Sequence, residues 1–147
     1  MKVLITGASG FIGSFLLKQL IKEDKHEVAV ILRDPLNAWR IKSFLEHVYL
    51  IKGSLDDPES YRSQLSVFKP DVLIHLAWDG VESKSRNATG QWRNVSYMLE
   101  LMKIAVSQDA HTFIGVGSQA EYGLVNARID ENEATKPTTL YGVSKLA

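Results

Sequence analysis

The sequence predicts an α/β fold, a doubly wound parallel sheet of about five strands with flanking helices. Short runs rich in Val and Ile recur along the chain, and segments with helical spacing lie between them. Strict strand and helix alternation requires right-handed crossovers, so the strands run parallel and helices cover both faces of the sheet. We therefore expect residues 1–147 to form one domain, which a chain of 147 residues is long enough to build.

The strands are expected where a short apolar run is bounded by polar or turn residues. Such runs are typical of strands buried on both faces. They are Val3–Ile5, Val28–Leu32, Val48–Ile51, Val72–Leu76 and Phe113–Val116.

Amphipathic helices are expected in the intervening segments, because apolar residues recur there at steps of three and four. The spacing predicts them over 11–20, 36–45 and 61–68. The last of these should begin at Asp57-Pro58-Glu59, where Asp57 offers a capping side chain and Pro58 suits the first helical position. The stretch 122–139 has no such pattern and is expected to be a long loop.

A longer helix is expected over 86–107, with a broad apolar stripe that includes Val95, Leu99, Met102 and Val106. Two readings of the stripe stay open. It pairs with a second copy of the chain and makes a homodimer, or it faces only its own sheet.

Composition excludes several classes of protein. Seventeen basic and seventeen acidic residues cancel, which gives no reason to expect nucleic acid or an anionic membrane as a partner. No cysteine is present, so disulfides and thiolate metal sites are excluded and a cytoplasmic location is expected. The four histidines lack metal-ligand spacing, and His75, inside a predicted strand, is expected to be a core residue.

A glycine-rich turn joins the first strand to the first helix. The segment reads TGASGFIG from Thr6 to Gly13, and a dinucleotide-binding loop requires this context of strand, turn and helix. Gly7 permits the tight turn, Gly10 lets a pyrophosphate approach the backbone, and Gly13 lets the helix pack on the strand. The predicted fold is therefore of the Rossmann type.

Tyr141 and Lys145 stand four residues apart in LYGVSKLA at the end of the chain, so a helix would place both on one face. Together with TGASGFIG, HLAW at 75–78, Asn94-Val95 and GSQAEYG at 117–123, this segment resembles the extended short-chain dehydrogenases/reductases. The resemblance covers the whole chain and is closest to nucleotide-sugar epimerases and 4-ketoreductases. It implies hydride transfer at a carbon of a nucleotide-linked sugar.

The resemblance also implies roles for individual residues. Tyr141 would be the acid and base, Lys145 would stabilise its phenolate and hold the nicotinamide ribose, and Ser118 would orient the reacting oxygen. The implied cofactor-binding residues are Gly7, Ser9, Gly10, Phe11, Ile12, Gly13, Arg33, Ser54, Leu55, Leu76, Ala77, Trp78, Asn94, Val116, Tyr141 and Lys145.

Three positions bear on the cofactor and the reaction. Arg33 ends the second strand, where an arginine suits the 2′-phosphate of NADP, with Arg40 as a second contact; Asp34 keeps NAD as the alternative. Ser54 replaces the aspartate that family members usually direct at adenine. Gln119 and Ala120 stand where family dehydratases carry an acid pair, which disfavours dehydration and leaves 4-ketoreductase and 4-epimerase. Arg33 tilts the choice to 4-ketoreductase.

Family members are about twice as long as this chain, and their later strands and substrate lobe follow the helix of Tyr141. The expectation is therefore an N-terminal part, inactive alone although it holds all three catalytic side chains. A non-catalytic dinucleotide-binding module is the alternative from another class.

Overall fold

The computed structural model describes residues 1–147, and the chain divides into two compact units. The first unit comprises Met1–Ala77 and Met98–Val116, and the second comprises Trp78–Tyr97 and Gly117–Ala147. Helix α3, Gln91–Val106, begins in the second unit and ends in the first. No helix is long and apolar enough to cross a membrane.

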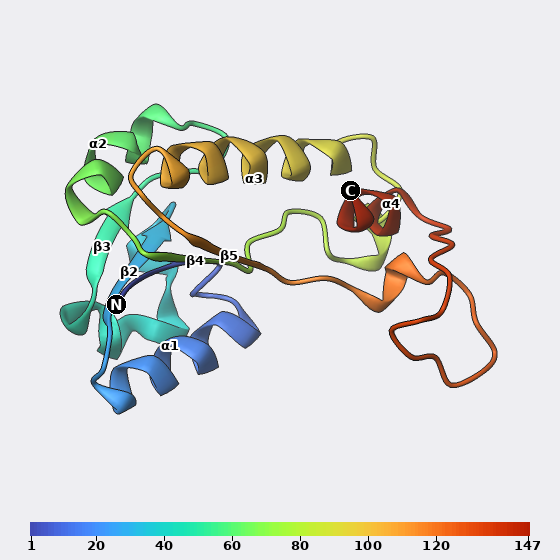
Figure 1. Ribbon diagram of the computed structural model, residues 1–147, viewed down its shortest axis with the longest axis horizontal. Helices are drawn as coiled ribbons and strands as arrows, with labels where there is room; N and C mark the ends of the chain where they lie inside the picture. The colour runs from blue at the N-terminus through green and yellow to red at the C-terminus, as the bar shows by residue number, and fades with distance from the viewer. The chain divides into compact units, whose positions relative to one another are not determined.

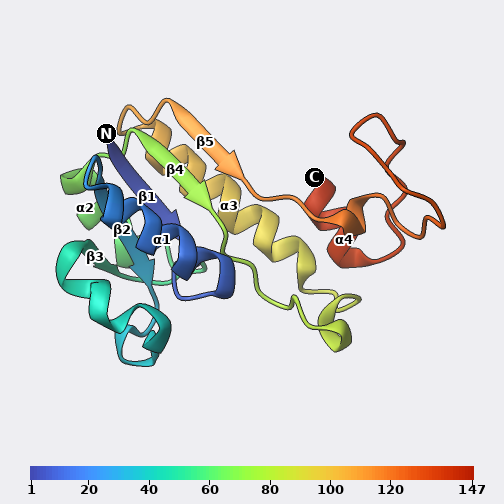
Figure 2. The same ribbon diagram turned by 90° about the horizontal axis from the view of Figure 1, so that it is seen from below.

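The first unit contains a five-stranded parallel sheet in the order β3-β2-β1-β4-β5 (Figures 1 and 2). The strands are β1 Lys2–Thr6, β2 Glu27–Leu32, β3 Tyr49–Lys52, β4 Val72–His75 and β5 Thr112–Gly115. The predicted parallel sheet is confirmed. Because the strand order reverses between β1 and β4, the carboxyl ends of these two strands mark the place where α/β sheets bind ligands.

Two apolar clusters hold the sheet between its helices. Helix α2, Glu59–Phe68, and the last turns of α3 cover one face, and helix α1, Phe11–Glu23, covers the other (Figure 1). Successive residues of β1 alternate between the clusters, with Leu4 in the first and Val3 and Ile5 in the second. This period of two is what a strand buried on both faces requires.

A strand forms near the predicted range 113–116, but the prediction that it is buried is wrong. Strand β5 is at the edge of the sheet, and Ile114 is 46% exposed. An apolar run predicts a strand, but only the strand order decides whether both of its sides are covered.

Helix α1 exposes two of the residues on which its prediction rested. Phe11 and Phe15 are 73% and 65% exposed and contact each other edge to face, with ring centroids 5.4 Å apart. The helix buries Gly13, Ser14 and Leu17 instead. The helix approaches the turn closely through Gly13, where a Cβ would collide with the Gly7 carbonyl, and this contact decides which face of the helix is inside.

The expected helix over 36–45 is a pair of 3₁₀ segments, η1 Pro35–Asn37 and η2 Trp39–His47. Ala38 separates them with φ −83° and ψ 48°, so no continuous α-helix forms. Ala38 and Ile41 are buried, whereas Leu36 and Trp39 are 94% and 71% exposed.

The starts of α2 and α3 also differ from the predictions. Pro58 is the N-cap of α2, which has no side-chain cap, and Asp57 contributes only its carbonyl oxygen, which accepts from the Ser60 amide at 3.1 Å. Helix α3 begins at Gln91 rather than at 86, because residues 83–85 form a separate 3₁₀ turn, η3.

The second unit contains η3, the first turns of α3, the 3₁₀ turn η4 Gln119–Glu121 and helix α4 Leu140–Leu146. The predicted long loop between η4 and α4 is confirmed. Gly123 closes its base with φ +74°, and any Cβ there would collide with the Lys136 carbonyl oxygen. The two ends of the loop therefore touch through their backbones.

Candidate active site

The glycine turn of the first unit lets its backbone lie directly against the backbone after β4 and against helix α1. Gly7 has φ +73°, and a Cβ there would lie 2.6 Å from the Ala77 nitrogen. A Cβ on Gly13 would collide with the Gly7 carbonyl, so the helix rests directly on the turn. The tight turn predicted at Gly7 is confirmed, and Gly13 allows the predicted close packing of the helix, although against the turn rather than the strand.

Helix α1 presents an uncapped N-terminus to this turn. Gly10 is its N-cap and supplies no side-chain hydrogen bond, and the first turn contains no acidic residue. A helix N-terminus of this kind favours an anion, because its dipole and its first amides are directed outward. The residues therefore fit a dinucleotide pyrophosphate, with Gly10, Phe11, Ile12 and Gly13 as the residues that would hold it.

The carboxyl ends of β1 and β4 are joined by a buried pair of side chains. Thr6 Oγ1 is 2.9 Å from His75 Nδ1 and accepts from the Ala77 amide at 3.3 Å. Both side chains are buried, and the His75 ring stacks on Phe113. His75 is thus a core residue, as predicted, and its partner Thr6 holds the backbone at Leu76 and Ala77 by accepting from both amides. Val116 is attached to the same edge through its amide, which donates to the His75 carbonyl.

At the end of β2, Asp34 is engaged within its own turn. Its carboxylate accepts from the Leu36 amide at 2.9 Å and from the Asn37 side chain. Arg33 is exposed, and the Arg40 guanidinium lies 4.3 Å from the centroid of the Trp39 ring.

At the end of β3, Ser54 is partly buried and also engaged locally. Its amide donates to Ser60 Oγ at 3.0 Å, and its hydroxyl donates to the Asp56 carboxylate. Leu55 packs against the core cluster on the α2 side of the sheet.

Tyr141, Lys145 and Trp78 come together in the second unit. Tyr141 is buried and meets the Trp78 ring edge to face, with centroids 6.0 Å apart. Lys145 Nζ lies 3.9 Å from the Trp78 centroid. Burial lowers the pKa of Lys145, and the carboxylate of Glu121 acts in the opposite direction.

Helix α4 is held at its first turn by other parts of the same unit. The Thr139 hydroxyl caps it by accepting from the Gly142 amide at 3.0 Å. The Tyr141 amide donates to the Arg86 carbonyl at 2.8 Å, and the Arg86 guanidinium lies 5.5 Å from the Tyr141 ring centroid. The helix predicted from the Tyr141 and Lys145 spacing is confirmed.

Ser118 lies at the N-cap of η4, in a turn that contacts α4. Its amide donates to the Glu121 carboxylate at 2.6 Å, and its hydroxyl accepts from the Ala120 amide at 3.2 Å. A Cβ at Gly142 would collide with the Ala120 carbonyl, so η4 and α4 are in direct backbone contact. This contact brings the segments that carry Ser118 and Tyr141 together.

Three residues of this unit were missed by the sequence analysis, namely Gln91, Arg86 and Glu121. Gln91 could have been found, because it precedes Asn94 by three residues on the helical face that continues to Leu101, and a polar residue on a buried face indicates a structural bond. Glu121 completes a capping box with Ser118, a pattern visible in the sequence as S-x-x-E. Arg86 has no sequence signal that we recognise.

Asn94, which the sequence analysis did single out, holds the loop after β4. Its amide group exchanges hydrogen bonds with the backbone of Asp79, accepting from the nitrogen at 2.8 Å and donating to the oxygen at 3.1 Å. It is 8% exposed.

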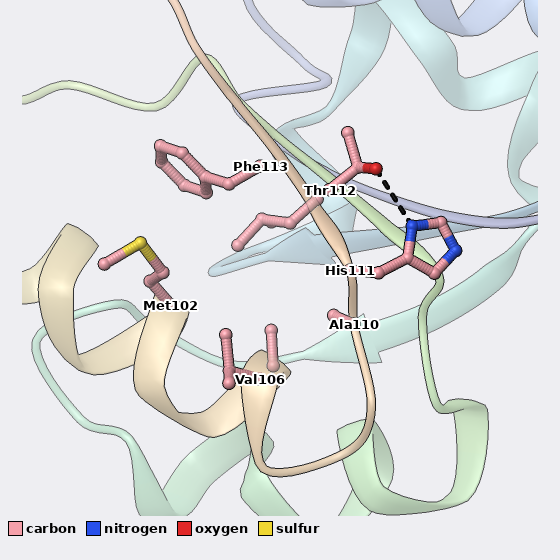
Figure 3. A pocket seen from close by; sticks show the side chains of 8 residues that line it. Met102, Val106, Ala110, His111, Thr112 and Phe113 are labelled. Atoms are coloured by element: carbon pink, nitrogen blue, oxygen red, sulfur yellow. Dashed lines mark hydrogen bonds between the residues drawn. The ribbon is translucent and has the colours of Figure 1, made fainter.

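A pocket of about 110 Å³ lies elsewhere in the first unit, between β5 and the end of α3 (Figure 3). Apolar side chains such as Met102, Val106 and Phe113 line most of it, and His111 bonds Thr112 at its rim. None of the predicted site residues lines it, so it is not part of the candidate active site.

The parallel sheet, the glycine turn and the uncapped helix N-terminus are features typical of dinucleotide-binding folds, and the second unit contains the predicted Ser, Tyr and Lys set. The family model described as "NAD dependent epimerase/dehydratase family" matches residues 3–147. The chain belongs to this family.

Curated relatives and solved structures agree with the family. An uncharacterized UDP-glucose epimerase, YtcB of Bacillus subtilis, is 31% identical over 157 aligned positions, covering 99% of this chain and 49% of that protein. The dTDP-6-deoxy-L-talose 4-dehydrogenase (NAD(+)) of Aggregatibacter actinomycetemcomitans is 28% identical, covering 99% and 52%. The UDP-glucuronic acid 4-epimerase of Bacillus cereus in complex with NAD has a TM-score of 0.81 at 26% identity, covering 99% and 49%.

The chain thus spans about half the length of the curated relatives that it matches. The relatives include epimerases and a 4-dehydrogenase, so the comparisons establish NAD-dependent nucleotide-sugar chemistry for the family without choosing one reaction.

Proposed function

We propose that this chain is the NAD(P)-binding part of an oxidoreductase or epimerase that acts at carbon 4 of a nucleotide-linked sugar. The observation that carries the proposal is the buried Tyr141, with Lys145 on the same short helix and the Ser118 turn packed against that helix. Families of this kind use such a set to move a proton while a hydride moves at the adjacent carbon.

Each residue has a definite part in the proposed reaction. A nicotinamide cofactor held at the glycine turn would supply the hydride for the carbonyl carbon of a 4-keto sugar, or accept one from the alcohol. In reduction, the Tyr141 hydroxyl gives its proton to the sugar oxygen, and the Lys145 ammonium stabilises the phenolate that is left. Ser118 hydrogen-bonds the reacting oxygen and orients it. In oxidation the phenolate takes the proton back.

Two reactions are candidates, and different observations favour them. We place 4-ketoreduction first, because Arg33 suits NADP, and reductases commonly draw on the reduced form of that cofactor. The relatives named as epimerases favour 4-epimerisation. In either case we expect a polypeptide limited to residues 1–147 to be inactive, because the curated relatives have about twice its length.

The first experiment compares turnover in the natural full-length protein on dTDP- and UDP-linked hexoses and their 4-keto forms. Ketoreduction consumes reduced cofactor, whereas epimerisation changes the sugar without net cofactor consumption. Tyr141→Phe should lower kcat by about a hundredfold or more while cofactor binding persists. Tyr49→Phe, on β3 of the first unit, is the matched control and should leave kcat unchanged. Cofactor binding without turnover of any sugar would instead indicate a non-catalytic dinucleotide-binding module.

The choice of cofactor is tested at Arg33. Its exposed guanidinium suits a 2′-phosphate, while Asp34, the residue that would bind the ribose of NAD, is engaged in capping η1. We therefore favour NADP, although the relatives named above carry NAD in their names or complexes. Arg33→Asp should weaken the binding of NADPH about tenfold or more and the binding of NADH much less. Equal losses would remove Arg33 from cofactor selection.

We further propose that α3 pairs with a second copy of the chain. Leu99 and Val106 are 41% and 60% exposed, and they share one helix face with Val95 and Met102, whereas Leu101 and Ile104 are buried in the core. An exposed apolar stripe on a helix commonly marks an interface. Sedimentation should show a dimer that Leu99→Glu dissociates. A monomer at high protein concentration would contradict the pairing.

A further inference from the structure

Trp78 bonds Gln91 through its indole nitrogen and contacts Lys145 and Tyr141 through its ring. Its indole Nε1 donates to Gln91 Oε1 at 2.9 Å. The face of its ring lies 3.9 Å from Lys145 Nζ, and the planes of the Trp78 and Tyr141 rings meet at 86°. The single polar atom of the indole is thus engaged, and the ring itself contacts two of the three predicted catalytic side chains.

Gln91 has a fixed orientation, because all of its side-chain polar atoms are used. It is 3% exposed, and its Nε2 donates to the Gly80 carbonyl at 2.8 Å and to the Ser85 carbonyl at 2.9 Å. Gly80 has φ +76°, and a Cβ there would lie 2.7 Å from Gln91 Nε2, so the loop is shaped around this amide. A buried amide with every bond made is costly to rotate or displace. Gln91 therefore fixes the position of the indole nitrogen.

A fixed aromatic surface restricts the position of the Lys145 ammonium. A lysine side chain has four carbons joined by rotatable bonds and a compact charge at its end, so its ammonium samples many positions unless contacts restrict it. A ring face within about 6 Å of the charge attracts it through the ring quadrupole. The Trp78 face thus restricts the ammonium. Tyr141 is restricted by a different contact, the edge-to-face packing of its ring with the indole.

We propose that Trp78 is a positioning residue for Lys145 and Tyr141, and that Gln91 sets the orientation of its ring. The inference rests on the proposed function for the part that concerns catalysis. The position of Lys145 relative to the ring can be measured without any turnover, which keeps the two proposals separable.

The first test is an NMR measurement on the natural full-length protein. Protons on the Lys145 ε-carbon should resonate upfield of those of other lysines, because this carbon is bonded to the Nζ that lies over the indole ring. Lys145→Met identifies their signal by its loss. Trp78→Leu should abolish the upfield shift. Trp78→Phe, which keeps a ring but loses the bond to Gln91, should reduce it. Trp92→Leu, one residue after Gln91 and 60% exposed, is the matched control and should leave the shift in place.

The second test is kinetic. Trp78→Leu should lower kcat about tenfold with little change in the KM of the sugar nucleotide, and Trp78→Phe should lower it by less. Trp92→Leu should stay within about twofold of wild type. Helical content by circular dichroism and retained cofactor binding identify variants that fold. If Trp78→Leu does not fold, Trp78→Phe takes its place in the comparison.

The outcomes are distinguishable. If Lys145 showed no upfield shift in the wild-type protein, or if Trp78→Leu matched Trp92→Leu in both resonance and kcat, the positioning role would be overturned. If the wild-type protein turned over no sugar nucleotide, the proposed function would fail. The Lys145 resonance alone would then decide whether this side chain lies over the Trp78 ring.

Discussion

Gly7→Ala is the substitution whose cost follows most directly from the structure. An L-residue at φ +73° costs roughly 1–2 kcal/mol relative to its preferred conformations. The new Cβ would also lie 2.6 Å from the Ala77 nitrogen and 2.7 Å from the Leu76 carbonyl carbon, which are backbone atoms just after β4 and cannot rotate away as a side chain could. Overpacking of this kind costs about 1–3 kcal/mol. The two contributions together give about 2–5 kcal/mol.

Urea unfolding followed by circular dichroism measures this loss. With a slope of about 2 kcal/mol per molar urea, the midpoint should fall by about 1–2.5 M. Gly90→Ala is the matched control, since its Cβ would meet no atom within 4 Å. Its midpoint should stay the same or rise slightly, because alanine restricts the unfolded chain. If both variants unfolded at the same urea concentration, the close approach of the turn to the end of β4 would not constrain the fold.

Three further substitutions test other parts of the molecule. Tyr61→Phe removes a fully buried hydroxyl that has no hydrogen-bond partner and whose burial raises the pKa of Tyr61 to about 12. The free energy of unfolding should therefore rise by about 1 kcal/mol, and a decrease would reveal an unseen partner. Leu101→Ala leaves a cavity in the core beside α2 and should cost about 2–5 kcal/mol, whereas Leu124→Ala, at a side chain 91% exposed, should cost almost nothing. Glu121→Gln removes the carboxylate that raises the pKa of Lys145, so this pKa should fall and the alkaline decline in activity should begin at lower pH, whereas Glu133→Gln should change neither. An NMR titration of Lys145 that was identical in all three proteins would contradict this role of Glu121.

The features that the sequence predicts well are those that depend on residues close together in the chain. Gly7 and Gly13 lie in one turn, and the requirement for missing side chains there is local. Tyr141 and Lys145 lie one helical turn apart, so their common face follows from the period of the helix. Alternation of strands and helices likewise fixes the parallel sheet before any contact is known.

The features that the sequence does not predict depend on the path of the chain between distant residues. Apolar spacing marks a helix from Phe11, but it cannot say that Phe15 faces solvent, because that depends on how Gly13 seats the helix. The bond from Trp78 to Gln91 depends on the course of the intervening loop. The same holds for Arg86, whose carbonyl accepts from Tyr141 across 55 positions of sequence.

The closed base of the loop between η4 and α4 separates residues that can change from residues that cannot. Because the backbones of Gly123 and Lys136 are in contact, the dozen residues between them form a side excursion whose length and composition can change without moving either end. Selection can therefore diversify this excursion while the helix of Tyr141 and the turn of Ser118 keep their mutual contact. For the experimenter it is the natural place to attach a fluorescent label or to insert a short epitope.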